Sequence, residues 1–357
     1  MLDRLPVFGI SGPHESGKTT LLEALLPRLA ARGLHVAVAK VHGSRLDLDR
    51  PGKDSDRLFR AGADVFRQGK DESFLRTRGE ASGAVEASLA RLAAGCDLVL
   101  VEGRKRVACD KVWLLGEGET AAPPAAGAAL AVLARSADRL AAVERLLGPW
   151  LAERWRRPPV YGCVLIGGAS RRMGWPKHLL PSGGRTWLER TVEILRPAVE
   201  RIVIAGAGDV PEALAGATRL PDAPDAEGPM AGILAAMRWA PWATWLLAAC
   251  DLPDLSADAV GWLLSTRAPG VWATLPRLPG KEGVESLLAH YDFRARAILE
   301  SLAAEGRFAP RLAAEHPKVA TPTPPSHLAS AWANVNAPDD YNTISPQRRR
   351  DRRGRIE

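Results

Sequence analysis

A phosphate-binding loop is the first group of residues in this chain whose types and spacing could perform chemistry. Gly12, Gly17, Lys18 and Thr19 occupy the fixed positions of the pattern G-x-x-x-x-G-K-[ST], and Thr20 follows them. Glycines let successive backbone N–H groups turn toward phosphate oxygens, while the lysine reaches the outer phosphates and the first threonine binds Mg²⁺. We therefore expect these residues to bind a nucleoside triphosphate. A glycine turn that only caps a helix is the alternative.

A carboxylate, Glu102, follows the apolar run Asp97–Val101. Ligands of open α/β sheets collect at the carboxyl ends of the parallel strands. Glu102 is therefore a candidate for binding the Mg²⁺ of the nucleotide or a water on that ion, and a solvated acid at a strand end would have the same position. This half of the chain contains no N-K-x-D motif, so the residues alone do not identify the base.

A second group of residues suited to nucleotide chemistry follows another apolar run, Val160–Ile166. The loop has the pattern G-G-x-S-x-R-M-G-x-x-K, in which the glycines permit close approach of a nucleotide to the backbone. Its serine, arginine and lysine bring hydrogen-bond donors and two positive charges onto one loop, which suits a triphosphate. We predict that the binding residues are Ile166, Gly167, Gly168, Ser170, Arg172 and Lys177.

Two acidic residues stand directly after apolar runs in the same half of the chain. Asp251 follows Trp245–Cys250, and Asp222 follows the shorter run Thr218–Pro221. Mg²⁺ is a hard cation that prefers carboxylate and phosphate oxygens, so Asp251 is a candidate ligand for that ion. A helix cap or a loop acid is the alternative for both residues.

The elements that must position these residues follow from an alternation of apolar strand-like runs with segments of helical period. Such alternation is typical of α/β architecture with parallel strands. In the first half we expect two helical stretches before Asp97, a helix over Thr19–Ala31, and strands over Leu5–Ile10, His35–Val41, Asp97–Val101, Val112–Leu115 and Ala129–Ala134. In the second half we expect strands over Val160–Ile166, Arg201–Ala205 and Trp245–Ala249 and helices over Trp187–Leu195, Met230–Trp239 and Ala257–Ser265.

Residues 148–159, GPWLAERWRRPP, interrupt this alternation with prolines and a basic cluster. A domain boundary is expected in such a segment. We predict a domain over 1–148, a linker over 149–159, a second domain over 160–344 and a disordered basic tail over 345–357. The chain has 357 residues, of which 46% are hydrophobic and 25% charged, and a composition of this kind suits two globular domains.

The formal net charge of +7 suggests at first a nucleic-acid or membrane partner. More than half of this charge lies in the tail 345–357, whose arginines have no aromatic residues between them for base stacking. We therefore expect binding to neither nucleic acid nor membrane. The four cysteines form no C-x-x-C pair, and the sequence shows neither a signal-peptide pattern nor a membrane-spanning stretch. A cytoplasmic location is expected.

Three segments of the first half resemble the molybdopterin-guanine dinucleotide biosynthesis accessory proteins (MobB family). They are GPHESGKTT, AKVHGSRLDLDRPGKDSDRLFRAGAD and DLVLVEGRK, and the resemblance covers about the first 145 residues. It implies a P-loop NTPase domain that binds GTP, hydrolyses it weakly, forms dimers and assists a partner enzyme. One departure is that Lys40 is followed by His42 alone, where the family usually carries several histidines. We assign no metal or phosphate role there.

The second half resembles the molybdenum cofactor guanylyltransferase (MobA) family from about Val160 to Ile344. The loop after Ile166, the G-P-[LM]-A-G turn, the C-D-x-P segment and the late NVNAPDD match in order. The resemblance implies a Rossmann-like fold of the nucleotide-diphospho-sugar transferase type. It also implies the following roles: guanine lies against Gly167 and Gly168, the phosphates contact Arg172 and Lys177, the nucleoside contacts Asp222, Mg²⁺ binds to Asp251, and the pterin contacts Asn334 and Asn336.

Two positions bear on the identity of the nucleotide. Relatives that use CTP tend to have Ala-Gly where this chain has Gly167-Gly168, so the family pattern favours GTP. The expected strand Arg201–Ala205 continues into Gly206 and Ala207, where the family often has an asparagine that contacts the nucleotide. We assign no such contact.

The two resemblances together predict a fusion protein that transfers GMP from GTP to molybdopterin already carrying molybdenum. The terminal phosphate of the pterin would attack the α-phosphorus of GTP, with catalysis by Lys177, Arg172 and Mg²⁺ on Asp251. Expected partners are GTP, molybdopterin, a second copy of the chain through the first domain, and molybdoenzymes or molybdenum-insertion proteins as recipients. The alternatives are a cytidylyltransferase for the same pterin or a sugar-1-phosphate nucleotidyltransferase, each with a non-catalytic nucleotide-binding adapter.

Overall fold

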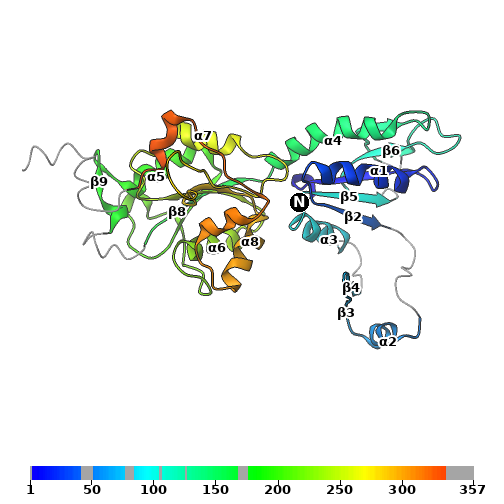
Figure 1. The fold of residues 1–357 in the computed structure, drawn as a ribbon, viewed down its shortest axis with the longest axis horizontal. Coiled ribbons are helices and arrows are strands. Elements are labelled where there is room, and N and C mark those ends of the chain that lie inside the picture. The colour runs from blue at the N-terminus through cyan, green and yellow to red at the C-terminus, as the bar shows by residue number, and fades with distance from the viewer. Residues whose placement is uncertain are drawn as a thin grey trace, which may run out of the picture. The chain divides into compact units, whose positions relative to one another are not determined.

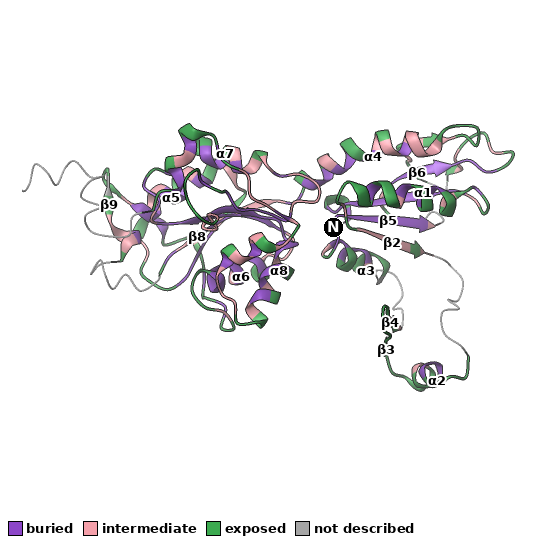
Figure 2. Cartoon of the chain, in the orientation of Figure 1, coloured by how far each residue is buried: buried purple, intermediate pink, exposed green. Residues whose placement is uncertain are grey.

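The computed structural model divides into two compact units, Met1–Leu151 and Ala152–Glu357 (Figure 1). The structure describes residues 2–41, 51–76, 84–103, 107–124, 127–167 and 176–334. Both units contain helices and sheets, and the sheet strands form the buried centre of each (Figure 2).

The division between the units lies inside helix α4 (Arg139–Arg156). Residues 149–156, which we expected in a linker, are therefore helical. The physical reason is a row of buried apolar side chains at helical spacing, which continues across Pro149. The row consists of Val143, Leu147, Trp150, Leu151 and Trp155.

The sheet of the first unit has five parallel strands in the order β2-β5-β1-β6-β7. Every strand expected in this half is present, with ends that differ by at most two residues. Apolar runs predict these strands well because a central parallel strand is covered on both faces. The strands are β1 (Val7–Ser11), β2 (Val36–Val41), β5 (Leu98–Gly103), β6 (Asp110–Leu114) and β7 (Ala131–Leu133).

Helix α1 (Lys18–Ala31) begins directly after the phosphate-binding loop. Its buried leucines recur at helical spacing, so one face of the helix packs on the sheet. Helix α3 (Ala84–Ala93) packs near β2 and β5, and a short 3₁₀-helix, η1 (Leu2–Arg4), precedes β1. The buried leucines of α1 are Leu21, Leu22, Leu25 and Leu29.

The segment between β2 and α3 contains helix α2 (Asp54–Ala61) and a separate antiparallel hairpin, β3 (Val65–Gln68) with β4 (Ser73–Arg76). The two helical stretches expected before Asp97 are present as α2 and α3, and the hairpin between them is an element that the prediction missed. Its strands have only four residues each, and neither VFRQ nor SFLR alternates apolar with polar side chains, so the sequence gives no strand signal here.

The second unit is built on a seven-stranded sheet in the order β12-β11-β8-β13-β15-β14-β16. The first four strands in that order are mutually parallel, whereas β15 is antiparallel to β13 and to β14. The strands predicted in this half, β8, β11 and β13, are parallel as expected, whereas the antiparallel strand β15, which makes the sheet mixed, was not predicted. The strands are β8 (Val160–Leu165), β11 (Arg201–Ala205), β12 (Thr218–Leu220), β13 (Thr244–Ala249), β14 (Ala273–Thr274), β15 (Leu288–Tyr291) and β16 (Val319–Ala320).

Helices cover both faces of this sheet (Figure 1). One face carries α5 (Trp187–Leu195) and α7 (Ala257–Ser265), and the other carries α6 (Pro229–Trp239) and α8 (Ala295–Ala304). The capping box of Thr186 and Glu189 fixes the start of α5. Shorter elements are β9 (Pro181–Ser182), β10 (Arg185–Thr186), η3 (Lys177–Leu179), η4 (Arg196–Ala198), η5 (Glu212–Leu214), η6 (Pro310–Glu315) and η7 (Ser326–Trp332).

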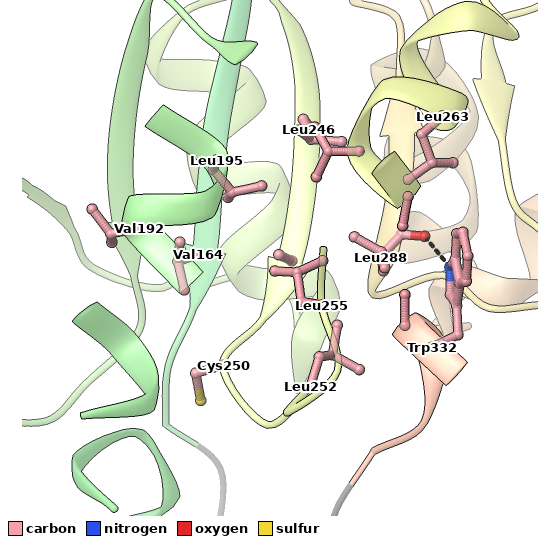
Figure 3. Close-up of a cluster of buried hydrophobic side chains, with 14 of the residues drawn as sticks. Val164, Val192, Leu195, Leu246, Cys250, Leu252, Leu255, Leu263, Leu288 and Trp332 are labelled. Atoms are coloured by element: carbon pink, nitrogen blue, oxygen red, sulfur yellow. Dashed lines mark hydrogen bonds between the residues drawn. The ribbon is translucent and has the colours of Figure 1, made fainter. Parts of the chain in front are cut away.

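A hydrophobic cluster fills the space between this sheet, α5, α7 and η7 (Figure 3). The Trp332 indole N–H donates to the Leu288 carbonyl at 2.8 Å, so η7 is tied to β15. Cys250 and Leu252 are both buried in the cluster, and Asp251 stands between them. Burial of each such side chain contributes about 1.5–3 kcal/mol. The core therefore fixes the backbone on both sides of Asp251.

Candidate functional sites

A cavity of about 450 Å³ lies where β8, β11 and β13 reach their carboxyl ends. The chain leaves β8 toward β11 on one side and returns to β13 on the other, which makes this the topological switch point of the sheet. Ligands of α/β folds bind at such points. The cavity is lined by Ile166, Gly167, Lys177, Asp222 and Asp251, all of which the sequence predicted.

An ion pair between Lys177 and Asp251 stands in the wall of this cavity. The Lys177 ammonium donates to Asp251 Oδ2 at 3.0 Å, and each side chain is 19% exposed. Lys177 opens η3 and Asp251 follows β13, so residues far apart in the sequence meet here. A charged pair that is largely withdrawn from water interacts strongly with a charged ligand. The arrangement can hold a phosphate at Lys177 and a cation at Asp251.

Cys250, the neighbour of Asp251, also lines the cavity. Burial, followed by the negative charge of Asp251, raises the pKa of the Cys250 thiol to about 12. The thiol is therefore protonated at neutral pH, and a protonated thiol is a poor nucleophile.

Asp222 reaches the cavity beside the first turn of α6. Desolvation raises the pKa of its carboxyl above the ordinary value. Gly232 lies directly against it, because a Cβ at that position would come 3.4 Å from Asp222 Oδ1 and 2.8 Å from Leu165 Cδ2. The second glycine of the G-P-M-A-G turn is thus needed for close packing of α6, and Gly228 adopts a left-handed φ of 56° just before it.

His178 is a cavity residue that the sequence analysis missed. It is 3% exposed, lines the cavity, and its Nε2 lies 2.8 Å from the Asp209 carbonyl oxygen. That hydrogen bond ties η3 to the loop after β11. The loop also comes close to the backbone after β8, since a Cβ on Gly206 would sit 2.0 Å from the Ile166 carbonyl oxygen. The adjacent Lys177 was the only sequence signal that could have pointed to His178.

The phosphate-binding loop of the first unit has the backbone form that its pattern requires. Gly17 is left-handed, with φ 82°, and forms the N-cap of α1. A Cβ on Gly12 would sit 2.5 Å from the Leu114 carbonyl oxygen, so only glycine fits there. The Lys18 ammonium lies over the loop, 3.2 Å from the Gly12 carbonyl oxygen and 3.4 Å from Ser16 Oγ. Thr20 follows Thr19 on the exposed side of α1.

Glu102 and Thr19 meet beside this loop. The Thr19 hydroxyl donates to Glu102 Oε1 at 3.2 Å, and the Lys40 ammonium lies 3.6 Å from the same oxygen. The register explains the contact, because Glu102 pairs with Ile10 of β1 on one side and with Lys40 of β2 on the other. Lys40 received no role from the sequence, and its position across the sheet from Glu102 could be known only from strand order.

Four predicted site residues, Gly168, Ser170, Arg172 and Asn336, lie outside the described residues. Asn334 is described, and it is exposed after η7. Among the described residues no group of three or more His, Cys, Asp or Glu side chains could by itself hold a metal ion. A Mg²⁺ at either site would therefore need the phosphates of its nucleotide in addition to carboxylate from these residues, which is a common arrangement for this ion.

Comparison with known proteins assigns the two halves to two families. Residues 7–138 match the family model "Molybdopterin guanine dinucleotide synthesis protein B", and residues 162–319 match "MobA-like NTP transferase domain". A relative from Bacillus mycoides, named "Probable molybdenum cofactor guanylyltransferase", is 30% identical over 149 residues, which are 40% of this chain and 74% of the relative. The chain belongs to the molybdenum cofactor guanylyltransferase family. Its second unit is a nucleotidyltransferase domain, and a MobB domain precedes it.

Two further relatives match one half each. The "Molybdenum cofactor guanylyltransferase" of Nitrobacter hamburgensis is 42% identical over 119 residues, which are 31% of this chain and 57% of the relative. The "Molybdopterin-guanine dinucleotide biosynthesis adapter protein" of Haemophilus influenzae is 39% identical over 119 residues, or 32% of this chain and 65% of the relative. In both cases the match spans less than two thirds of the relative.

None of the helices in the described ranges combines the length and the apolar character needed to cross a membrane.

Proposed function

We propose that the chain transfers the guanylyl group of GTP to molybdopterin, with molybdenum already bound to the pterin, and that pyrophosphate is released. The observation that carries this proposal is the Lys177–Asp251 pair in the cavity at the switch point of the sheet. An ammonium and a carboxylate side by side in the cavity wall suit a triphosphate that arrives with a metal ion. Membership of the guanylyltransferase family supports the same reaction.

The chemistry needs no nucleophile from the protein. An oxygen of the pterin's terminal phosphate forms a bond to the α-phosphorus of GTP, and the bond from that phosphorus to the β-bridging oxygen breaks. Pyrophosphate leaves with the electron pair, and no proton has to move. Lys177 and Arg172 neutralise charge on the phosphates and align the two reactants. The protonated Cys250 thiol takes no part.

Asp251 is the residue that would hold Mg²⁺ for this reaction, and its chemistry fits that ion. It is a carboxylate in the cavity wall at the end of β13, and its backbone is held by the buried neighbours Cys250 and Leu252. Mg²⁺ bound there would neutralise negative charge on the triphosphate and polarise the phosphoryl oxygens. In the same proposal Asp222 contacts the nucleoside, Gly167 and Gly168 the guanine, and Asn334 and Asn336 the pterin.

The first unit, in this proposal, binds GTP at Lys18 and Thr19 with Mg²⁺ near Glu102, and it assists the transferase. Its Thr19–Glu102 contact of 3.2 Å has the geometry of a hydroxyl and a carboxylate that share one hydrated ion. We also propose that two copies associate through this unit. Phe66 and Leu75 pair across the β3–β4 hairpin and are 62% and 63% exposed, which supports an interface there.

The reaction is proposed to take place in the cytoplasm, with molybdoenzymes or their molybdenum-insertion proteins receiving the product. All four cysteines are free in the structure, as a reducing compartment requires.

The test of the transferase assignment is Asp251→Ala in the full chain. We expect formation of the guanine dinucleotide from GTP and molybdopterin to fall by at least about a hundredfold, the scale of losing one electrostatic contact to the transition state. Asp254→Ala is the matched control, because Asp254 is exposed three residues later in the same turn. Full activity of Asp251→Ala would refute the metal assignment. Competition between GTP and CTP with molybdopterin as acceptor decides the nucleotide, and a preference for CTP would overturn the guanylyl proposal.

A further inference from the structure

Arg139 binds four backbone carbonyls in the first unit, and none of the roles given above involves it. Its Nη1 donates to the Ser16 carbonyl at 2.6 Å, and its Nη2 donates to the Leu115 carbonyl at 2.6 Å and the Leu133 carbonyl at 3.1 Å. Its Nε donates to the Ala134 carbonyl at 2.9 Å. Ser16 belongs to the phosphate-binding loop, and the other acceptors follow β6 or end β7. One guanidinium therefore joins the loops after three neighbouring strands.

The guanidinium of Arg139 lies directly beside the phosphate loop. A Cβ on Gly17 would sit 3.7 Å from Arg139 Nη1, so the positive charge lies directly behind the turn that receives the phosphates. A guanidinium can serve several acceptors at once because its donors form a rigid planar fork, which a lysine ammonium lacks. The loop after β6 also packs closely against the phosphate loop, because a Cβ on Gly116 would meet Pro13 Cγ at 2.6 Å.

The strands over which Arg139 lies also indicate the direction of the bound nucleotide. In the order β2-β5-β1-β6-β7, Glu102 is on β5 and Lys40 on β2, so the proposed metal end of the nucleotide is on one side of β1. Arg139 lies on the other side, over β6 and β7. A nucleotide whose phosphates occupy the loop after β1 and whose metal faces Glu102 has its nucleoside directed toward β6 and β7.

We infer that Arg139 is a positioning residue for the nucleotide of the first unit. Arg139 holds the phosphate loop in register with the loops after β6 and β7, and the nucleoside end of the nucleotide lies over those two loops. This inference rests on the proposed binding of GTP by the first unit. It assigns the base to a place that no sequence motif marked.

The test measures the affinity of Mg·GDP and of inorganic pyrophosphate by calorimetry in the full chain. Lys177→Ala is present throughout, so that the transferase cavity does not contribute. We expect Arg139→Ala to weaken both ligands, because Nη1 also holds the Ser16 carbonyl of the phosphate loop. GDP should be weakened at least threefold more than pyrophosphate, because only GDP has a nucleoside over the loops after β6 and β7 that Nη2 and Nε hold. Arg139→Lys keeps the charge and loses the fork, and we expect it to weaken GDP at least fivefold. Should Arg139→Ala fail to fold, the lysine variant carries the same comparison.

Two controls separate the inference from the function on which it rests. Arg145→Ala changes an exposed arginine of the same helix and should leave both affinities unchanged. Lys18→Ala should abolish binding of both ligands. If the Lys177→Ala parent binds no GDP, or if it still binds GDP normally after Lys18→Ala is added, the proposed GTP site and the inference both fail. If Lys18→Ala abolishes binding while Arg139→Ala resembles Arg145→Ala, or weakens both ligands equally, the inference alone is overturned.

Discussion

Replacement of His290 by leucine should remove an acid sensitivity of the second unit. His290 lies in β15 and is 1% exposed, and neither ring nitrogen has a hydrogen-bond partner in the described part of the chain. Burial, and secondly the positive charge of Arg267, lowers the pKa of His290 to about 3. The folded chain therefore keeps a neutral imidazole at pH values where the unfolded chain, with a pKa of about 6.5, takes up a proton.

The size of the effect follows from this difference in proton binding. Between pH 6.5 and pH 3 the unfolded state binds the extra proton, so the free energy of unfolding falls by about 1.4 kcal/mol for each pH unit below 6.5. The contribution of the neutral His290 to the free energy of unfolding is fully present above pH 6.5 and is lost as the pH falls toward 3. At pH 5 the loss is about 2 kcal/mol, or about 4–8 °C in Tm for a unit of this size. Leucine cannot titrate, and it removes two buried nitrogens whose missing hydrogen bonds cost about 1–3 kcal/mol each.

The assay is thermal unfolding from pH 8 to pH 5 of wild type, His290→Leu and His327→Leu. His327 is exposed and serves as the matched control. At pH 8 we expect His290→Leu to be at least as stable as wild type. Its advantage in Tm should then grow by about 4–8 °C on acidification to pH 5. Parallel curves of Tm against pH for wild type and His290→Leu would refute the reasoning.

Three further predictions concern packing, assembly and acid stability. Gly232→Ala places a methyl group 2.8 Å from Leu165 Cδ2, so we expect a loss of about 1–3 kcal/mol in stability and a several-fold higher KM for GTP; an unchanged KM and Tm would contradict the packing. Phe66→Ser combined with Leu75→Ser should convert a dimer into a monomer in light scattering, and an unchanged mass would exclude the hairpin as the interface. The Gly52 backbone N–H, with Arg76 and Arg60, lowers the pKa of Asp56 to about 2. The contribution of the Asp56 carboxylate to stability is present above pH 3.8 and is lost toward pH 2. Asp56→Asn should therefore make the segment 51–76 susceptible to protease at pH 7 and remove that acid transition. Equal cleavage of the variant and the wild type would disprove this.

The elements that the sequence predicted well are those with a dense local signal. Central strands such as β1, β5 and β13 are continuous apolar runs, since both faces of the strand are covered. The phosphate-binding loop was identifiable because close approach of the Leu114 carbonyl excludes a side chain at Gly12 and a left-handed φ of 82° favours glycine at Gly17. The β3–β4 hairpin and the strands after α7 were missed, because strands of two to four residues are too short to show a period.

The candidate sites show the same division more sharply. The sequence by itself indicated two loops with the residue patterns of nucleotide-binding loops and the lysines and acids that accompany them. Only the tertiary structure decided which of these residues meet: Lys177 contacts Asp251 across 74 positions, and Thr19 contacts Glu102 across 83. It also brought in His178, Lys40 and Arg139, to which the sequence analysis gave no role. The reason is physical, because such contacts depend on strand order and on the crossovers between strands, and those are set by how the whole core packs rather than by any local pattern.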